Sequence, residues 1–192
     1  MVFYTILSAF SSAILFAYIG SSPFIFQDHY GVSPMTFSVI FASNAVAMMM
    51  GNFFSIQFKN LHKTLTCSVT GLFCFALATG TALLFHVPLY LFCIPLFIML
   101  FFTGAIFPIV TNLVLEMEQK YRGTASAILG ASGFLAGGLV MPLAGLGNIL
   151  SSTACVFMAC ALMAVVMLYL LRHRNIPHSK YLSAKRDRRP YL

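Results

Sequence analysis

The positions of the basic residues constrain this chain more than any other feature of its sequence. The chain contains six long apolar runs, and its eleven lysines and arginines fall in only three of the places between or after them. These places are residues 59–64, residues 116–123 and the segment after residue 171. If each run is a membrane span, all three places lie on the same side of the bilayer. Because positively charged loops stay in the cytoplasm, the pattern predicts six spans with both termini cytoplasmic.

Composition identifies the solvent of these runs as lipid. Hydrophobic residues make up 60% of the chain and charged residues only 8%, against about 25% charged residues in a typical soluble domain. A soluble core of 192 residues could not enclose this much apolar side chain. The net charge of +7 lies mainly in residues 172–192, where it is interpreted as a topological signal rather than a nucleic-acid site. The first predicted partner is therefore the lipid bilayer, and no nucleic acid is expected.

The fold predicted from these runs is an all-α integral membrane bundle. A spanning helix needs roughly 20 apolar residues. The spans are expected at about 3–26, 35–58, 65–85, 88–114, 124–147 and 150–171, which makes 1–171 a single transmembrane domain followed by a basic cytoplasmic tail at 172–192. The connections between the spans are short, so consecutive helices are expected to run antiparallel.

Polar side chains recur on single faces of three spans. The first span has Tyr4, Ser8, Ser11, Tyr18 and Ser22, and the fourth has Thr103 and Thr111 with Phe107 between them. In the second span Asn44, Met48, Asn52 and Ser55 share a face, and Asn44 is its candidate for the cavity. Their spacing places the members within each span on one helical face. A single Ser or Thr of this kind is interpreted as an interhelical hydrogen-bonding group. The stripe of the first span as a whole predicts the lining of a water-filled cavity, and Asn44 together with the named residues of the first and fourth spans are the candidates for a substrate cavity.

The fifth span is rich in glycine. Gly133 and Gly137 form a GxxxG motif, and Pro142 lies near the end of the span. Small residues let helix backbones approach closely, so the motif predicts tight packing. The alternative is a gating helix that bends at Gly and Pro.

Two halves of the chain repeat one another faintly. The repeated positions are Gly20 and Pro23 against Gly104 and Pro108, followed by Gly51 against Gly137. The first and fourth spans enter the membrane from opposite sides, so the pattern predicts an inverted 3+3 repeat.

The central parts of the spans contain no acidic or basic side chain, and all five histidines lie in loops or the tail. No catalytic motif, CxxC pair or metal-ligand spacing is present. The sequence therefore predicts that the protein is not an enzyme and holds no cofactor or metal. A proton pathway needs a titratable group, and Asp28 at the end of the first span is the one candidate. If the protein uses protons, the proton-carrying group is therefore expected to lie outside these spans.

Two segments resemble a known family. YIGSSPFIFQDHYGVSPMTFSVIFASNAVAMMMGN (18–52) is similar to the seventh and eighth spans of bacterial Bcr/CflA multidrug-resistance transporters, and RGTASAILGASGFLAGGLVMPLAGL (122–146) is similar to their eleventh span. The resemblance implies the C-terminal half of a major facilitator fold, and proton-driven efflux of drugs or small metabolites across the bacterial inner membrane. In that fold the first and fourth helices of each half line the cavity. For this chain the resemblance therefore implies that the stripes of the first and fourth spans line a cavity.

The chain has six spans where that family has twelve. We therefore expect a truncated or split transporter that works with a missing N-terminal six-helix half or with a second copy of itself, on a small-molecule substrate. The alternatives are an inert remnant and a regulatory membrane subunit without transport of its own.

Overall fold

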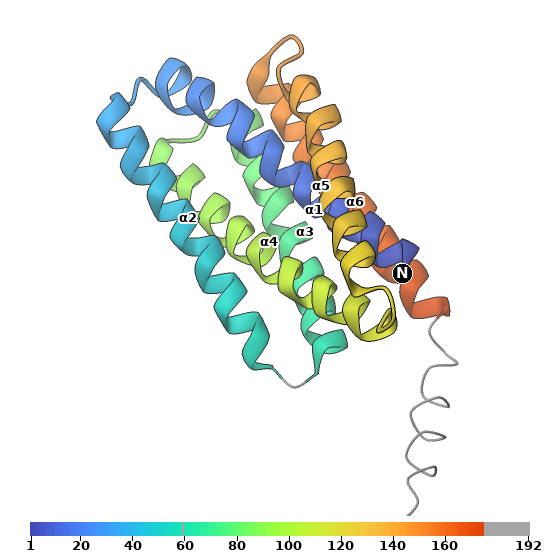
Figure 1. Ribbon diagram of the computed structural model, residues 1–192. Helices are drawn as coiled ribbons and strands as arrows, with labels where there is room; N and C mark the ends of the chain where they lie inside the picture. The colour runs from blue at the N-terminus through green and yellow to red at the C-terminus, as the bar shows by residue number, and fades with distance from the viewer. Residues whose placement is uncertain (59, 175–192) are drawn as a thin grey trace, which may run out of the picture.

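The structure is a computed structural model that describes residues 1–58 and 60–174. The described residues form six long helices and one π-helical turn, with no strand (Figure 1). The elements are α1 (Val2–Pro23), η1 (Phe24–His29), α2 (Pro34–Gln57), α3 (Leu61–Leu84), α4 (Leu89–Met117), α5 (Arg122–Ala144) and α6 (Ile149–Arg174). Each long helix is sufficiently long and apolar to cross a membrane. The predicted all-helical bundle of six spans is confirmed, while Lys59 and residues 175–192 lie outside the described residues.

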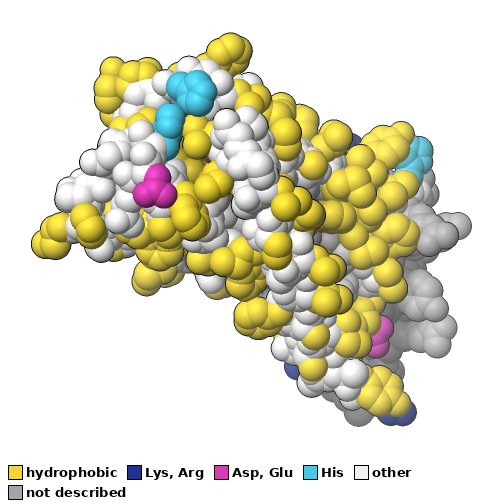
Figure 2. Space-filling view, turned by 90° about the horizontal axis from the view of Figure 1, so that it is seen from above, with side chains coloured by type: hydrophobic (Ala, Val, Ile, Leu, Met, Phe, Trp, Pro, Cys, Tyr) yellow, Lys and Arg dark blue, Asp and Glu magenta, His cyan; other side chains and the backbone are white. Residues whose placement is uncertain are grey.

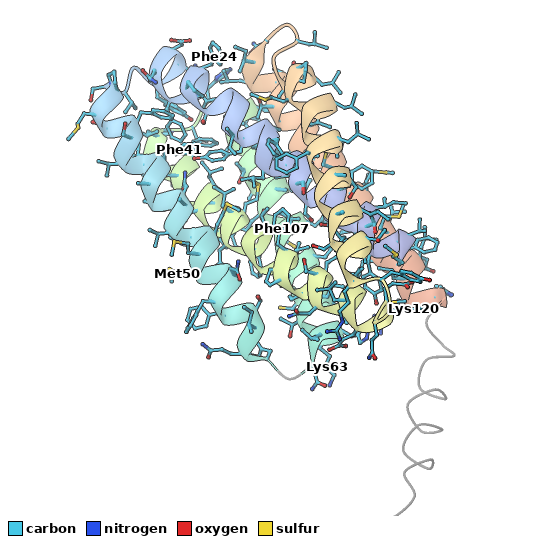
Figure 3. All side chains as sticks on the ribbon, viewed as in Figure 1. Phe24, Phe41, Met50, Lys63, Phe107 and Lys120 are labelled. Atoms are coloured by element: carbon cyan, nitrogen blue, oxygen red, sulfur yellow. The ribbon has the colours of Figure 1, made fainter. Side chains whose placement is uncertain are left out.

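The basic connections gather at one end of the bundle. Figure 3 places Lys63, at the start of α3, and Lys120, just before α5, at the same end, and Phe24 at the opposite end. Arg122 begins α5 at the basic end, and Arg172 lies in the last turn of α6. Within the described residues the charge asymmetry is thus a property of the fold. The cytoplasmic assignment of this end remains a prediction.

The helices form two packed groups. In one group α1 packs on α5 and α6, and in the other α4 packs on α2 and α3 (Figure 1). Exchanging α1 with α4, α2 with α5 and α3 with α6 converts the first group into the second. The packing therefore has the symmetry that the predicted 3+3 repeat requires. The consecutive helices α1 and α2 make few close contacts with each other, unlike α3 and α4.

Glycines occupy equivalent contacts in the two groups. A Cβ atom on Gly20 of α1 would lie 2.7 Å from Met141 Cγ of α5, and one on Gly104 of α4 would lie 2.8 Å from Met48 Cα of α2. A larger residue at Gly104 would push α2 and α4 apart, because its neighbour is backbone, whereas one at Gly20 would displace the flexible Met141 side chain. These contacts explain the repeated glycines of the sequence as sites of close helix approach.

The second repeated pair behaves in the same way. Gly51 of α2 faces the backbone of Phe101 in α4, and Gly137 of α5 faces the side chain of Phe16 in α1. Gly133 also lies at the contact with α1, whereas Pro142 is exposed near the end of α5.

Several helix ends differ by three or more residues from the ranges expected from hydropathy, including those of α4 at Met117 rather than 114 and of α6 at Arg174 rather than 171. The α3 helix begins at Leu61 rather than at 65, because a helix can continue past the apolar run into the aqueous interface. The α5 helix ends at Ala144 rather than at 147, with Gly145 as its C-terminal cap. Gly147 adopts a left-handed conformation with φ +69°, through which no α-helix continues.

The first span continues as a π-helical turn from Phe24 to His29 instead of ending at residue 26. The irregularity follows a proline. Pro23 has no N–H to donate to the carbonyl of Ile19, and the Ser22 hydroxyl donates to that carbonyl at 3.1 Å. Ser22 thereby satisfies a backbone group that lipid could not satisfy.

Candidate functional site between α1, α2 and α4

The structure places most of the candidate cavity residues inside the bundle. Tyr4, Ser8, Ser11, Tyr18, Ser22, Asn44 and Thr103 are buried, while Phe107 and Thr111 are half-buried. In Figure 3, Phe41 lies in the space between α2 and α1, and Phe107 lies in the middle of the bundle. The polar stripes therefore face other helices within this chain, and their role in a substrate cavity remains a prediction.

Four hydroxyls of the stripes, those of Ser11, Ser22, Thr103 and Thr111, are satisfied within their own helices. Ser11 donates to the carbonyl of Leu7 at 3.2 Å, and Thr103 donates to the carbonyl of Met99 at 2.9 Å. Thr111 likewise donates to a carbonyl one turn earlier. These bonds differ from the interhelical bonds expected of single hydroxyls. Because each hydroxyl hydrogen is already donated to a backbone carbonyl, no donor is left unpaired, and each hydroxyl oxygen can still accept a hydrogen bond.

One polar pair does join two helices. Asn44 Nδ2 of α2 donates to Tyr18 Oη of α1 at 2.9 Å, and both side chains are buried. In the described part of the chain this is the one hydrogen bond between side chains of different helices. Because the amide donates, the Tyr18 hydroxyl retains its own proton for a further acceptor. The pair is therefore both a helix link and a potential polar contact for a ligand.

Tyr18 and Asn44 lie where the backbones of α1 and α2 are far apart. The Phe41 ring of α2 stacks on the Tyr18 ring, with centroids 5.7 Å apart and planes 13° apart. Side chains alone thus close the gap between these consecutive helices. We refer to the contact made by Tyr18, Phe41 and Asn44 as the α1–α2 seam.

A continuous row of aromatic rings extends the seam toward the end of the bundle that lacks basic residues. Each ring centroid lies 5.7–5.9 Å from the next. In order, this aromatic row is Tyr18, Phe41, Phe37, Phe26, Phe92 and Tyr30. Such spacing is typical of favourable aromatic contacts. Sequence reasoning missed the row, although the four-residue spacing of Phe37 and Phe41 on one helical face was a usable signal.

Tyr30 ends the row by joining two loops. Its hydroxyl donates to the carbonyl of Val87 at 2.9 Å, which links the α1–α2 connection to the α3–α4 connection. Burial raises the pKa of Tyr30 above its ordinary value, with a smaller contribution from the charge of a Cys93 thiolate. This end of the bundle is therefore fixed by a hydrogen bond as well as by ring packing.

The seam contains no carboxylate and no metal-binding group. Among the described residues no cluster of three or more His, Cys, Asp or Glu side chains is present. Asp28 is exposed in η1, outside the seam. The seam offers an amide, a phenol and aromatic faces, which suit binding of a small molecule rather than proton transfer.

The six apolar helices and their packing define a multi-pass α-helical membrane protein. The chain belongs to the Major Facilitator Superfamily, whose family description it matches over residues 1–191. The predicted superfamily is thereby confirmed.

The chain is also similar to the uncharacterized MFS-type transporter YdgK of Bacillus subtilis (strain 168). The two are 32% identical over 136 residues, which cover 69% of this chain and 34% of the relative. The matched stretch thus spans about a third of the length of that relative.

Proposed function

We propose that this chain is one six-helix half of a proton-driven exporter of small molecules. Superfamily membership supports a transport role, and the match to only 34% of the Bacillus relative supports a half-size unit. The resemblance of residues 18–52 and 122–146 to Bcr/CflA transporters supports drugs or small metabolites as substrates and the C-terminal half as the origin. The proposed location is the bacterial inner membrane, with both termini cytoplasmic.

The observation that carries the proposal is the α1–α2 seam. A transporter must expose its binding groups to one side of the membrane and then to the other. Two helices that touch only through side chains can separate without breaking a close backbone contact. The helices α1 and α2 touch in this way at the α1–α2 seam. Its opening would present the Tyr18 phenol and the Asn44 amide to a substrate, with Phe41 beside them as an apolar face.

The second wall of the substrate path requires a partner. The α2 and α5 helices bury only 22% of their most apolar window within this chain. Gly130 and Gly138 of α5 have open space where a Cβ atom would lie, which permits close approach by another helix. We propose that the partner is an N-terminal six-helix half or a second copy of this chain. Because the described seam lacks a carboxylate, the proton-carrying group belongs to that partner or to Asp28.

Drug efflux in an exporter-deficient bacterium tests this function. The chain is expressed alone and then together with the N-terminal half of a related transporter. Efflux by the chain alone would support a second copy as partner, and efflux only on co-expression would support a split carrier. No efflux in either case, despite membrane insertion, would refute the proposal in favour of an inert remnant or a regulatory subunit.

Residue-level variants then test the seam, in whichever arrangement transports. Tyr18→Phe and Asn44→Ala are expected to reduce efflux at equal expression, whereas Thr81→Ala, which alters an exposed residue of α3 away from the seam, is not. Equal efflux by all three variants would remove the seam from the substrate path. Reporter fusions at Lys63 and at the C-terminus should read cytoplasmic and one at His29 periplasmic, and a periplasmic C-terminus would overturn the proposed orientation.

A further inference from the structure

Two exposed histidines face one another at the end of the bundle that lacks basic residues. His29 ends η1, and His86 lies in the α3–α4 connection. Their ring centroids are 5.2 Å apart, with planes tilted by 44°. Figure 2 shows histidine side chains side by side at one end of the visible face, with an acidic side chain at the same end. The fold thus brings together two exposed imidazoles that are far apart in the sequence.

The backbone holds His86 in a conformation that favours glycine. Its φ is +50°, which makes it the one non-glycine residue with positive φ in the described part of the chain. The amide of Val87 donates to the carbonyl of Ala82 at 3.2 Å, and that of His86 donates to the carbonyl of Leu83 at 3.4 Å. These two bonds form a Schellman motif, in which glycine or asparagine usually occupies the left-handed position. A residue kept there despite strain is a candidate for a function.

Neighbouring contacts fix the two rings relative to each other. The His29 ring packs edge-on against Tyr30, with centroids 4.8 Å apart. The Tyr30 hydroxyl bonds to the carbonyl of Val87, the residue next to His86. The two loops that carry the histidines are therefore linked beside the pair, and the imidazoles need little reordering to share a ligand.

We propose that His29 and His86 together bind a divalent transition-metal ion of the zinc type. With Zn–N distances of about 2.0–2.1 Å and tetrahedral geometry, two coordinating imidazoles have ring centroids about 5 Å apart, as this pair does. Neither imidazole makes a hydrogen bond to a described residue, so their nitrogens remain open to a ligand. Water completes the coordination, because no third His, Cys, Asp or Glu side chain of the described residues joins the pair.

The electrostatic setting suits a cation. The lysines and arginines of the described residues lie at the opposite end of the bundle, as Figure 3 shows for Lys63 and Lys120. With two protein nitrogens the site is open and exchangeable, unlike a closed four-ligand structural site. A bound ion joins the α1–α2 connection to the α3–α4 connection above the aromatic row. This inference stands apart from the proposed transport function and does not depend on it.

The test is a zinc titration of the full chain in detergent, purified without a histidine tag and followed by calorimetry and thermal unfolding. The variants are His29→Ala, His86→Gly and His86→Asn, and the matched control is His62→Ala, an exposed histidine at the start of α3. Glycine and asparagine both suit the left-handed backbone, so the His86 variants keep the fold while losing the ligand.

The wild-type chain and the control are expected to bind one zinc ion each and to melt at higher temperature when zinc is present. The His29 and His86 variants should bind zinc at least about tenfold more weakly and lose the zinc-dependent shift. Absence of zinc binding by the wild-type chain would overturn the site. Equal binding by the variants and the control would also overturn it, by showing that the ion is held elsewhere.

Discussion

Neighbouring helices of the bundle are held together in two different ways, as a comparison of the α2–α4 crossing with the α1–α2 seam shows. At the α2–α4 crossing, glycines let the two backbones touch. A Cβ atom on Gly51 would lie 2.8 Å from the carbonyl carbon of Phe101, and one on Gly104 would lie 2.8 Å from Met48 Cα. At the seam, the Tyr18–Asn44 hydrogen bond and one ring stack join helices whose backbones barely meet. The first contact cannot change without unpacking, whereas the second can open by rotating side chains.

This difference divides the six helices into two units. One contains α1, α5 and α6, and the other contains α2, α3 and α4. Each unit draws helices from both sequence repeats, so the repeats are interleaved in space. The two units also pack against each other where α3 meets α6, as extensively as α1 packs on α6. We therefore infer that the seam opens by a local separation of α1 from α2, while the α3–α6 contact keeps the two units together.

The largest loss of folding stability is expected from Gly104→Ala. The added methyl group meets the backbone of Met48, which cannot rotate away, so the α2–α4 crossing must separate. Overpacking of this kind costs about 1–3 kcal/mol, and the rigid neighbour places this change at the upper end. Reversible unfolding in mixed detergent micelles would measure the loss.

Gly130→Ala is the matched control, because that glycine has open space around its Cβ position. It should be neutral or stabilising by up to about 1 kcal/mol, through the higher helix propensity of alanine. Equal losses in the two variants would show that helix propensity, rather than close approach, governs these glycines.

A smaller effect is expected from Gly20→Ala at the equivalent α1–α5 crossing. There the methyl group meets the side chain of Met141, which is flexible and 43% exposed. A loss of about 1 kcal/mol is expected. Adding Met141→Ala should recover most of it, as a double-mutant cycle would reveal. Failure of this rescue would mean that the two crossings are equally rigid.

Hydropathy and periodicity were sufficient to predict the six helices, the repeat and the polar faces. They could not predict which neighbour each face would meet, because periodicity identifies a face and not its partner. Tyr18 and Asn44 were both candidates, but their bond depends on how α1 and α2 are spaced in three dimensions. The close approach of His29 and His86 was equally invisible, since it results from two loops that are distant in the sequence.

Loosening the seam should have a still smaller effect on stability. Tyr18→Phe removes the acceptor for Asn44, and interhelical hydrogen bonds in membranes contribute about 0.6 kcal/mol on average. The double variant with Asn44→Ala should lose little more than the single variants, since the two groups act as one pair. A coupling energy near zero in mixed micelles would show that the bond does not hold the seam, whatever its role in transport.

The smallest effect is expected where the row of rings reaches water. Tyr30→Phe keeps the ring stacked on Phe92 and removes only the half-exposed bond to the carbonyl of Val87, so the loss of stability should be at most about 0.5 kcal/mol. Because burial raises the pKa of Tyr30 in the folded chain, its contribution is complete below pH of about 10 and declines as pH rises through the folded pKa. The wild-type chain should therefore lose stability in alkaline detergent more steeply than Tyr30→Phe. Parallel alkaline titrations of the two would mean that ring packing alone closes this end, as it does along the rest of the row.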